Sequence, residues 1–182
     1  MKIVFISFLF AFSFSNLASA EVKTRKPNSV SKKEKPLVTI DVGGSSGIYN
    51  TRSYTEMTLG VNLNFTDWLT LRNAGFKRFS SAGDKDLTGL DSTLRFIATA
   101  PFDGGAFRVF VGPGYRWADP SDKNAVVGEA GVGLSVGRVG ISGGAKYLKY
   151  DKVQIDSRTG LETSREDIHY FITLSGGAGL SF

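Results

Sequence analysis

The 182-residue chain contains no cysteine, which excludes disulfides, thiolate metal sites and a lipid anchor attached to cysteine. It has one histidine and two methionines against 22 glycines and 14 phenylalanines, a balance that favours β-structure with tight turns over helices. After residue 20 there is no run of about 18 apolar residues, so no transmembrane helix is expected there. A barrel strand, however, spans a membrane in about 9–11 residues with only alternate positions apolar.

The positive charge is confined to one end of the chain. Of the net +5, Lys2 contributes one and residues 21–36 contribute four, whereas residues 37–182 carry 15 basic and 15 acidic side chains. Because the larger part of the chain is balanced, nothing in its charge indicates a nucleic-acid partner.

The first residues have the order of a secretory signal peptide. Lys2 precedes the apolar run Ile3–Phe14, and the small residues Ala18-Ser19-Ala20 complete a cleavage site, so residues 1–20 are predicted to be removed. The apolar run is shorter than the roughly 20 residues that an uncleaved anchor would need. Residues 21–36 lack apolar periodicity and are predicted to form a flexible basic periplasmic tail, either solvated or in contact with anionic lipid.

From Leu37 onward the pattern has a period of two. It is clearest between Tyr54 and Phe65, where apolar residues such as Leu59 and Val61 alternate with polar ones such as Glu56. A helix would scatter both sets around its axis, so this alternation predicts a strand. Similar segments give eight predicted strands at 38–43, 54–65, 68–79 (with a bulge near 73–75), 90–100, 107–116, 129–136, 139–147 and 169–182.

The connections between these segments alternate in length. Three are short, at 66–67, 103–105 and 137–138, and four are longer and polar, at 45–53, 80–88, 118–124 and 151–166. Short turns at one end and long loops at the other are typical of outer-membrane barrels. Residues 37–182 are therefore predicted to form an all-β, eight-stranded antiparallel up-and-down transmembrane β-barrel, and the last loop is expected to form a hairpin around residues 158–160.

The polar face of the strands predicts which side is the interior. It is rich in glycine, serine and threonine with isolated charges, too few for a solvated surface but suited to the narrow lumen of an eight-stranded barrel. Buried charges must be paired, and Glu129 is expected to pair with Lys146 across their hairpin. The predicted structural charge network of the lumen comprises Asp41, Glu56, Arg72, Asp91, Arg95, Arg108, Arg116, Glu129 and Lys146.

Aromatic residues gather toward the strand ends, which favours a membrane barrel because its interfaces carry aromatic girdles. The core of a β-sandwich would not sort them in this way. One group lies at the short turns (Phe65, Trp68, Phe102, Phe107, Phe182) and the other toward the long loops (Tyr49, Tyr54, Phe79, Tyr115, Trp117, Tyr147, Tyr170).

The sequence ends on Phe182, with Leu180 and Ala178 on the same predicted face. This pattern resembles the C-terminal assembly signal of bacterial outer-membrane barrels, and residues 110–117 resemble the glycine-aromatic strand of OmpA-like and OmpX-like barrels. The resemblance implies a monomer in the bacterial outer membrane that contacts lipid and lipopolysaccharide and meets the barrel-assembly machinery through its C-terminal strand. It implies no ligand-binding residue.

Catalytic and metal-binding patterns are missing. Lipid A deacylases of this size use a His-x-Ser pair, but His169 is followed by Tyr170 and Phe171, and Ser175 lies about 20 Å further along the strand. His169 is therefore expected at the rim of the barrel. The loop aspartates lack the spacing of a calcium loop.

No catalytic residue, cofactor or metal is therefore predicted. The expected function is that of a non-enzymatic outer-membrane protein that contributes to membrane structure and displays loops. The alternatives are a lipid A-modifying enzyme centred on His169 and an adhesin or receptor that acts through residues 151–166.

Overall fold

The computed structural model describes residues 36–49, 52–80, 87–156 and 159–176. The predicted signal peptide (residues 1–20), the predicted basic tail up to residue 35 and the predicted assembly signal at Ala178, Leu180 and Phe182 lie outside this part of the chain. Within the described residues, no helix is both long enough and apolar enough to cross a membrane.

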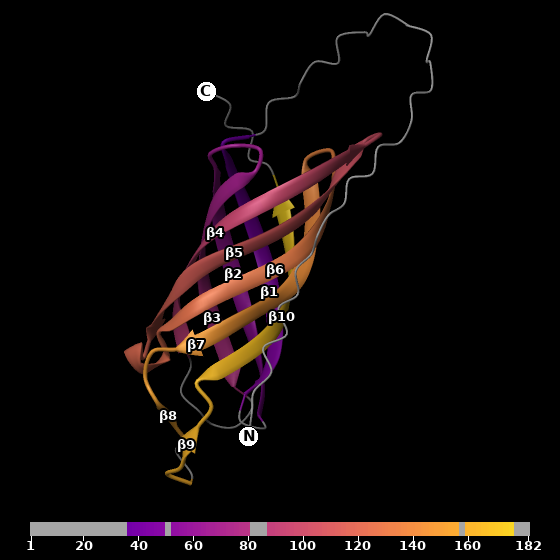
Figure 1. The fold of residues 1–182 in the computed structure, drawn as a ribbon. Helices are drawn as coiled ribbons and strands as arrows, with labels where there is room; N and C mark the ends of the chain where they lie inside the picture. The colour runs from indigo at the N-terminus through magenta and orange to yellow at the C-terminus, as the bar shows by residue number, and fades with distance from the viewer. Residues whose placement is uncertain (1–35, 50–51, 81–86, 157–158, 177–182) are drawn as a thin grey trace, which may run out of the picture. The chain divides into compact units, whose positions relative to one another are not determined.

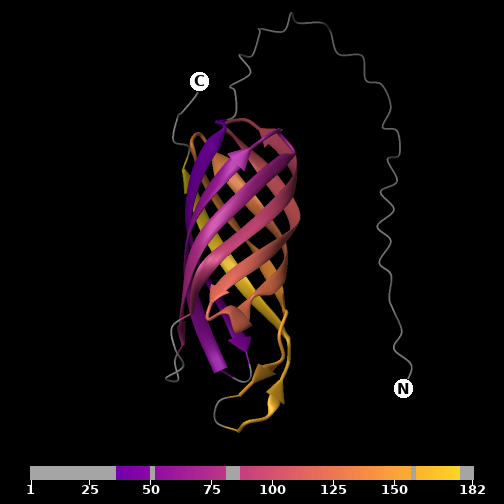
Figure 2. The same ribbon diagram turned by 90° about the vertical axis from the view of Figure 1, so that its left-hand side faces the viewer.

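Eight antiparallel strands close into a barrel in which neighbours along the chain are hydrogen-bonded and β1 pairs with β10 (Figure 1). The strands are inclined to the barrel axis, as closure requires (Figure 2). The predicted eight-stranded up-and-down fold is thereby confirmed. The barrel strands are β1 (Val38–Tyr49), β2 (Arg52–Asn64), β3 (Leu69–Ser80), β4 (Leu87–Phe102), β5 (Gly105–Asp119), β6 (Ala125–Val136), β7 (Val139–Tyr150) and β10 (Glu166–Gly176).

The two ends of the barrel differ in their connections. At what we call the short-turn end, Gly104 and Gly137 adopt positive φ angles of 87° and 61° in tight turns, a conformation that favours glycine. At the opposite, long-loop end, the 3-10 helix η1 (Ser121–Lys123) follows β5. The predicted hairpin of the last loop is present: β8 (Gln154–Ile155) pairs with β9 (Glu162–Thr163) and extends beyond the barrel (Figures 1 and 2).

Two local predictions are wrong. The segment 45–53 is mostly strand rather than loop, because β1 runs to Tyr49 and β2 begins at Arg52. Its glycines and serines are typical of a loop and suggested one here. Gly47 is nevertheless part of the strand, where its lack of a side chain leaves room for the Tyr54 ring opposite, whose Oη would be 2.6 Å from an added Cβ. There is also no bulge at residues 73–75, because the β2–β3 register runs without a shift from Tyr54 opposite Ser80 to Asn64 opposite Thr70.

Alternate side chains point into and out of the barrel. Leu59, Val132 and Leu174 are 60%, 49% and 53% exposed, whereas Glu56 and Glu129 are 0% and 2% exposed. The apolar side chains thus lie on the outside and the charged ones line the lumen. This is the orientation that the sparse charges of the polar face predicted.

Four aromatic rings of the lumen each lie opposite a glycine on the neighbouring strand. A Cβ at Gly131 would lie 2.6 Å from Cζ of Phe110, so a larger residue there would displace the ring. Tyr54, predicted for the outer aromatic group, is one of these interior rings and is 6% exposed. The four pairs are Tyr54–Gly47, Phe76–Gly89, Phe110–Gly131 and Phe171–Gly144.

Candidate functional site: the charged lumen

The lumen concentrates the ionisable side chains of the barrel, and every barrel strand contributes at least one. Apart from Arg108, these groups are each at most 8% exposed, so they are not solvated as surface charges would be. Among the described residues, five carboxylates (Asp41, Glu56, Asp91, Glu129, Asp167) are matched by five bases (Arg72, Arg78, Arg95, Arg116, Lys146).

Arg116 is the centre of this network and has no exposed surface. Its Nε and Nη2 donate to the two oxygens of Asp91 at 2.7 and 2.8 Å, and its Nη1 and Nη2 donate to the two oxygens of Glu56 at 2.8 and 3.0 Å. The guanidinium carbon also lies 3.9 Å from the centroid of the Phe76 ring. A planar guanidinium suits this double two-pronged contact, which an ammonium group could not reproduce.

Each carboxylate beside Arg116 binds a second cation. Arg78 Nε donates to Glu56 Oε1 at 2.7 Å, and Lys146 Nζ donates to Asp91 Oδ2 at 2.6 Å. The interior thus alternates acids and bases, as buried ions require if their desolvation is to be offset.

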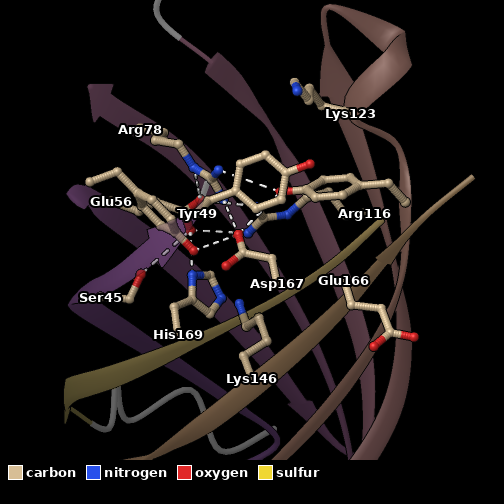
Figure 3. Close-up of polar contacts among 12 residues, drawn as sticks. Ser45, Tyr49, Glu56, Arg78, Arg116, Lys123, Lys146, Glu166, Asp167 and His169 are labelled. Atoms are coloured by element: carbon tan, nitrogen blue, oxygen red, sulfur yellow. Dashed lines mark hydrogen bonds and ion pairs between the residues drawn. The ribbon is translucent and has the colours of Figure 1, made fainter. Parts of the chain in front are cut away.

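The network continues toward the long-loop end through Asp167. Its Oδ2 accepts hydrogen bonds from Tyr54 Oη at 2.6 Å and Tyr150 Oη at 3.2 Å, and lies 3.4 Å from Arg78 Nη2. Figure 3 shows Arg78 and Asp167 converging with Glu56 in the lumen.

Nearer the short-turn end, two further ion pairs cross between strands. Asp41 accepts from Arg72 Nε and Nη2 at 3.0 and 2.6 Å and from Asn62 Nδ2 at 2.7 Å. Glu129 accepts from Arg95, whose Nη2 lies 3.2 Å from Oε2 and whose Nε binds the other oxygen.

A small apolar cluster covers the network at the long-loop end. It consists of Ala125, Val127, Leu148 and Tyr150, each at most 1% exposed, with Tyr49 packed against it. The rings of Tyr49 and Tyr150 meet edge to face at 5.5 Å between centroids. The lumen is therefore occupied by charged side chains over much of its length and by apolar side chains at this end.

The structure places eight of the nine predicted lumen residues deep in the interior. Arg108 is half-buried on the wall of a cavity near the short-turn end and makes no ion pair with any described residue. The predicted Glu129–Lys146 pair is wrong: the two residues are level in the β6–β7 ladder, but Lys146 reaches across the lumen to Asp91, and Glu129 binds Arg95.

His169 does not lie at the rim, as predicted, but is fully buried in the lumen. β10 begins at Glu166, earlier than the sequence indicated, and this carries the imidazole inside the barrel. Its Nδ1 lies 3.6 Å from Glu56 Oε2, and neither ring nitrogen has a hydrogen-bond partner within the described residues. An imidazole without accessible surface cannot meet a substrate that stays outside the lumen.

Sequence reasoning missed Arg78 and Asp167. A signal for both was present in the alternation, because Arg78 has the same parity as Arg72 in β3 and Asp167 the same parity as His169 in β10. Both lie close to a predicted loop, and this concealed them.

No group of three or more metal-ligating side chains is positioned to hold a metal ion within the described part of the chain. Comparisons with protein-family models, with curated proteins and with solved structures gave no match.

Proposed function

We propose that this protein is a non-enzymatic integral β-barrel of the bacterial outer membrane that contributes to membrane structure and displays loops at one surface. The observation that carries the proposal is the inversion of the barrel, with apolar side chains outside and paired charges inside. A soluble barrel of the same size would have the opposite arrangement, because water solvates charges and disfavours apolar surface.

The outer surface supports lipid as its surroundings. Val42, Leu59, Val111 and Ile172, each from a different strand, are 51–62% exposed. In water each such side chain would cost about 25 cal/mol for every Å² of exposed apolar area, and a hydrocarbon environment removes that cost.

Aromatic side chains at both ends of this surface also support a membrane. Trp68 and Phe65, each 55% exposed, lie beside the first short turn, whereas Trp117 (49%) and Tyr170 (70%) lie toward the long loops. Girdles of aromatic side chains are typical of the two interfaces of a membrane barrel, and tryptophan and tyrosine rings are amphipathic. We propose that the short turns face the periplasm and the long loops the exterior.

The filled lumen favours a structural role over transport, because the side chains of an eight-stranded barrel occupy its interior. The burial of His169 argues against the lipid-modifying alternative. We expect a His169→Ala variant to leave lipid A unchanged by mass spectrometry, and an altered acylation pattern would restore that alternative.

The absence of cysteine allows a direct test of the proposal. Single cysteines at Leu59, Val132 and Leu174 would carry spin labels in the barrel reconstituted in phospholipid vesicles, with Leu161→Cys on the last loop as the control. We expect the three barrel labels to be relaxed by oxygen more than by a water-soluble nickel complex, and the Leu161 label to show the reverse. Nickel-accessible barrel labels, or recovery of the native protein in the soluble periplasmic fraction, would contradict the proposal.

A second candidate function is binding through the last loop. Ile155 and Leu161, 64% and 68% exposed, lie on the β8–β9 hairpin beyond the barrel, and the strand edges of a protruding hairpin can accept a partner's strand. Deleting residues 153–163 should leave the heat-dependent gel mobility of the barrel intact. Unaltered binding of the deleted protein to a surface that the intact protein binds would count against this function.

A further inference from the structure

We propose that the lumen contains a binding site for a small oxyanion of the phosphate class, in a cavity near the short-turn end with Arg108 as its charged ligand. The cavity has a volume of about 70 Å³. Its wall combines apolar residues such as Phe110 with side chains that can donate hydrogen bonds, among them Asn62, Ser142, Thr173 and Arg108.

A positive charge on the cavity wall, unpaired within the described residues, favours an anion. The other two ionic side chains on the cavity wall are already paired, since Asp41 binds Arg72 and Arg95 binds Glu129. Arg108 is left with no acidic partner among the described residues. A half-buried guanidinium without a counter-charge is costly, and an oxyanion would supply the missing charge together with two oxygens that can accept parallel hydrogen bonds from the planar guanidinium.

The nearest carboxylate does not close the cavity to anions. Both oxygens of Asp41 accept hydrogen bonds, Oδ1 from Arg72 and Oδ2 from Arg72 and Asn62. Its charge is therefore neutralised within its own pair, and its oxygens have donors already.

Neutral donors line the same cavity as Arg108. Ser142 and Thr173 share one hydrogen bond of 2.6 Å between their hydroxyl oxygens. Only one of the two protons is used in that bond, so the other hydroxyl can turn its proton to a ligand. One arginine with several hydroxyl and amide donors is a set that matches the acceptor oxygens of a phosphate or sulfate.

The size of the cavity limits the ligand. Water occupies about 30 Å³ per molecule in the liquid, so the cavity holds a few water molecules or one tetrahedral oxyanion. The site lies inside the barrel and does not depend on whether lipid surrounds the outer face.

The test uses the full chain folded in detergent micelles and inorganic phosphate as the probe. Amide chemical shifts are followed by NMR during the titration, at an ionic strength held constant with chloride. We expect saturable shifts at cavity residues such as Gly133, Ser142 and Thr173, and a parallel titration with sulfate distinguishes phosphate from tetrahedral oxyanions in general.

Two variants assign the charged ligand. Arg108→Gln should weaken phosphate binding by about tenfold or more, since a charge-assisted contact is lost, whereas Arg138→Gln in the exposed turn at the same end should bind as the native protein does. Arg108→Gln leaves no buried carboxylate unpaired, so we expect it to fold, and its heat-dependent gel mobility will show whether it does. If it does not fold, the test rests on phosphate binding by Arg108→Lys and on whether the saturable shifts of the native protein lie at the cavity residues. Shifts that do not saturate, that are confined to exposed residues such as Arg138, or that persist unchanged in Arg108→Gln would overturn the proposal.

Discussion

Arg116→Met tests the lumen network at its centre. The substitution removes four hydrogen bonds, two to Asp91 and two to Glu56, and leaves five buried carboxylates facing four buried bases. Removing one partner of a buried ion pair costs about 3–5 kcal/mol, because the remaining charge stays in a poorly solvated site. We therefore expect the free energy of unfolding to fall by about 3–5 kcal/mol, and by less in Arg116→Lys, which keeps the charge.

The assay is urea unfolding of the barrel in phospholipid vesicles, followed by the fluorescence of Trp68 and Trp117. A double-mutant cycle with Glu56→Gln separates charge balance from packing. In the double variant Arg78 keeps Asp167 and Asp91 keeps Lys146, so the charges of the network balance again.

We expect the double variant to lose less stability than the two single variants summed, by about 0.5–3 kcal/mol. Arg138→Met at an exposed turn serves as the control and should change the stability by less than about 0.5 kcal/mol. A loss below about 1 kcal/mol in Arg116→Met, or strict additivity in the cycle, would refute the reasoning.

Three further predictions concern the wall of the barrel. Val111 lies on the exterior at mid-strand, and Val111→Arg should lower the free energy of unfolding in vesicles by about 2–4 kcal/mol. Ile155→Arg on the hairpin should leave that free energy nearly unchanged. Equal effects of the two substitutions in urea unfolding would mean that no lipid contacts Val111. Leu148→Ala should lower the free energy of unfolding by about 2–5 kcal/mol, because this fully buried side chain belongs to the apolar cluster of the lumen. A decrease below about 1 kcal/mol would show that the cluster is loosely packed. Gly144→Ala should lower the yield of refolded barrel on a gel, since an added Cβ would lie 2.1 Å from a backbone oxygen. In the control Gly128→Ala the added Cβ meets nothing within 4 Å, so this variant should refold normally. Similar yields would contradict the close approach of the neighbouring backbone to Gly144.

Alternation was sufficient to predict most of the barrel. In β2 the residues from Tyr54 to Asn64 alternate so regularly that the strand and the two residue sets of its faces followed from the alternation, whereas the orientation of the faces followed from the sparse charges of the polar one. The failure in β1 has a physical cause, because Gly43 to Gly47 offer no apolar side chains to alternate. That stretch is nevertheless held as a strand by ladder bonds to β2 and β10, which a local pattern does not reveal.

The pairing of the lumen charges could not be predicted from the sequence, for a different reason. The alternation along the strands predicts that Glu129, Lys146 and Asp91 face inward. The partner of each, however, depends on how far its side chain reaches across a narrow lumen. Lysine and arginine are long enough to pass a level neighbour and bind a carboxylate on the far side, as Lys146 does. Level position in a hairpin therefore predicts contact between short side chains better than between long ones.

Several of the ion pairs brace strands that the backbone does not join. Arg116 of β5 binds Glu56 of β2, Lys146 of β7 binds Asp91 of β4, and each of these links spans three steps around the ring of eight strands. Backbone ladders hold each strand only to its two neighbours and would tolerate flattening of the barrel, whereas these links fix the distance across it. Each also needs its partners in place before its charges can leave water, so the lumen should desolvate only as the ring closes. A wall braced in this way should have little freedom to move, so specific binding is expected in the loops or in the cavity that Arg108 lines.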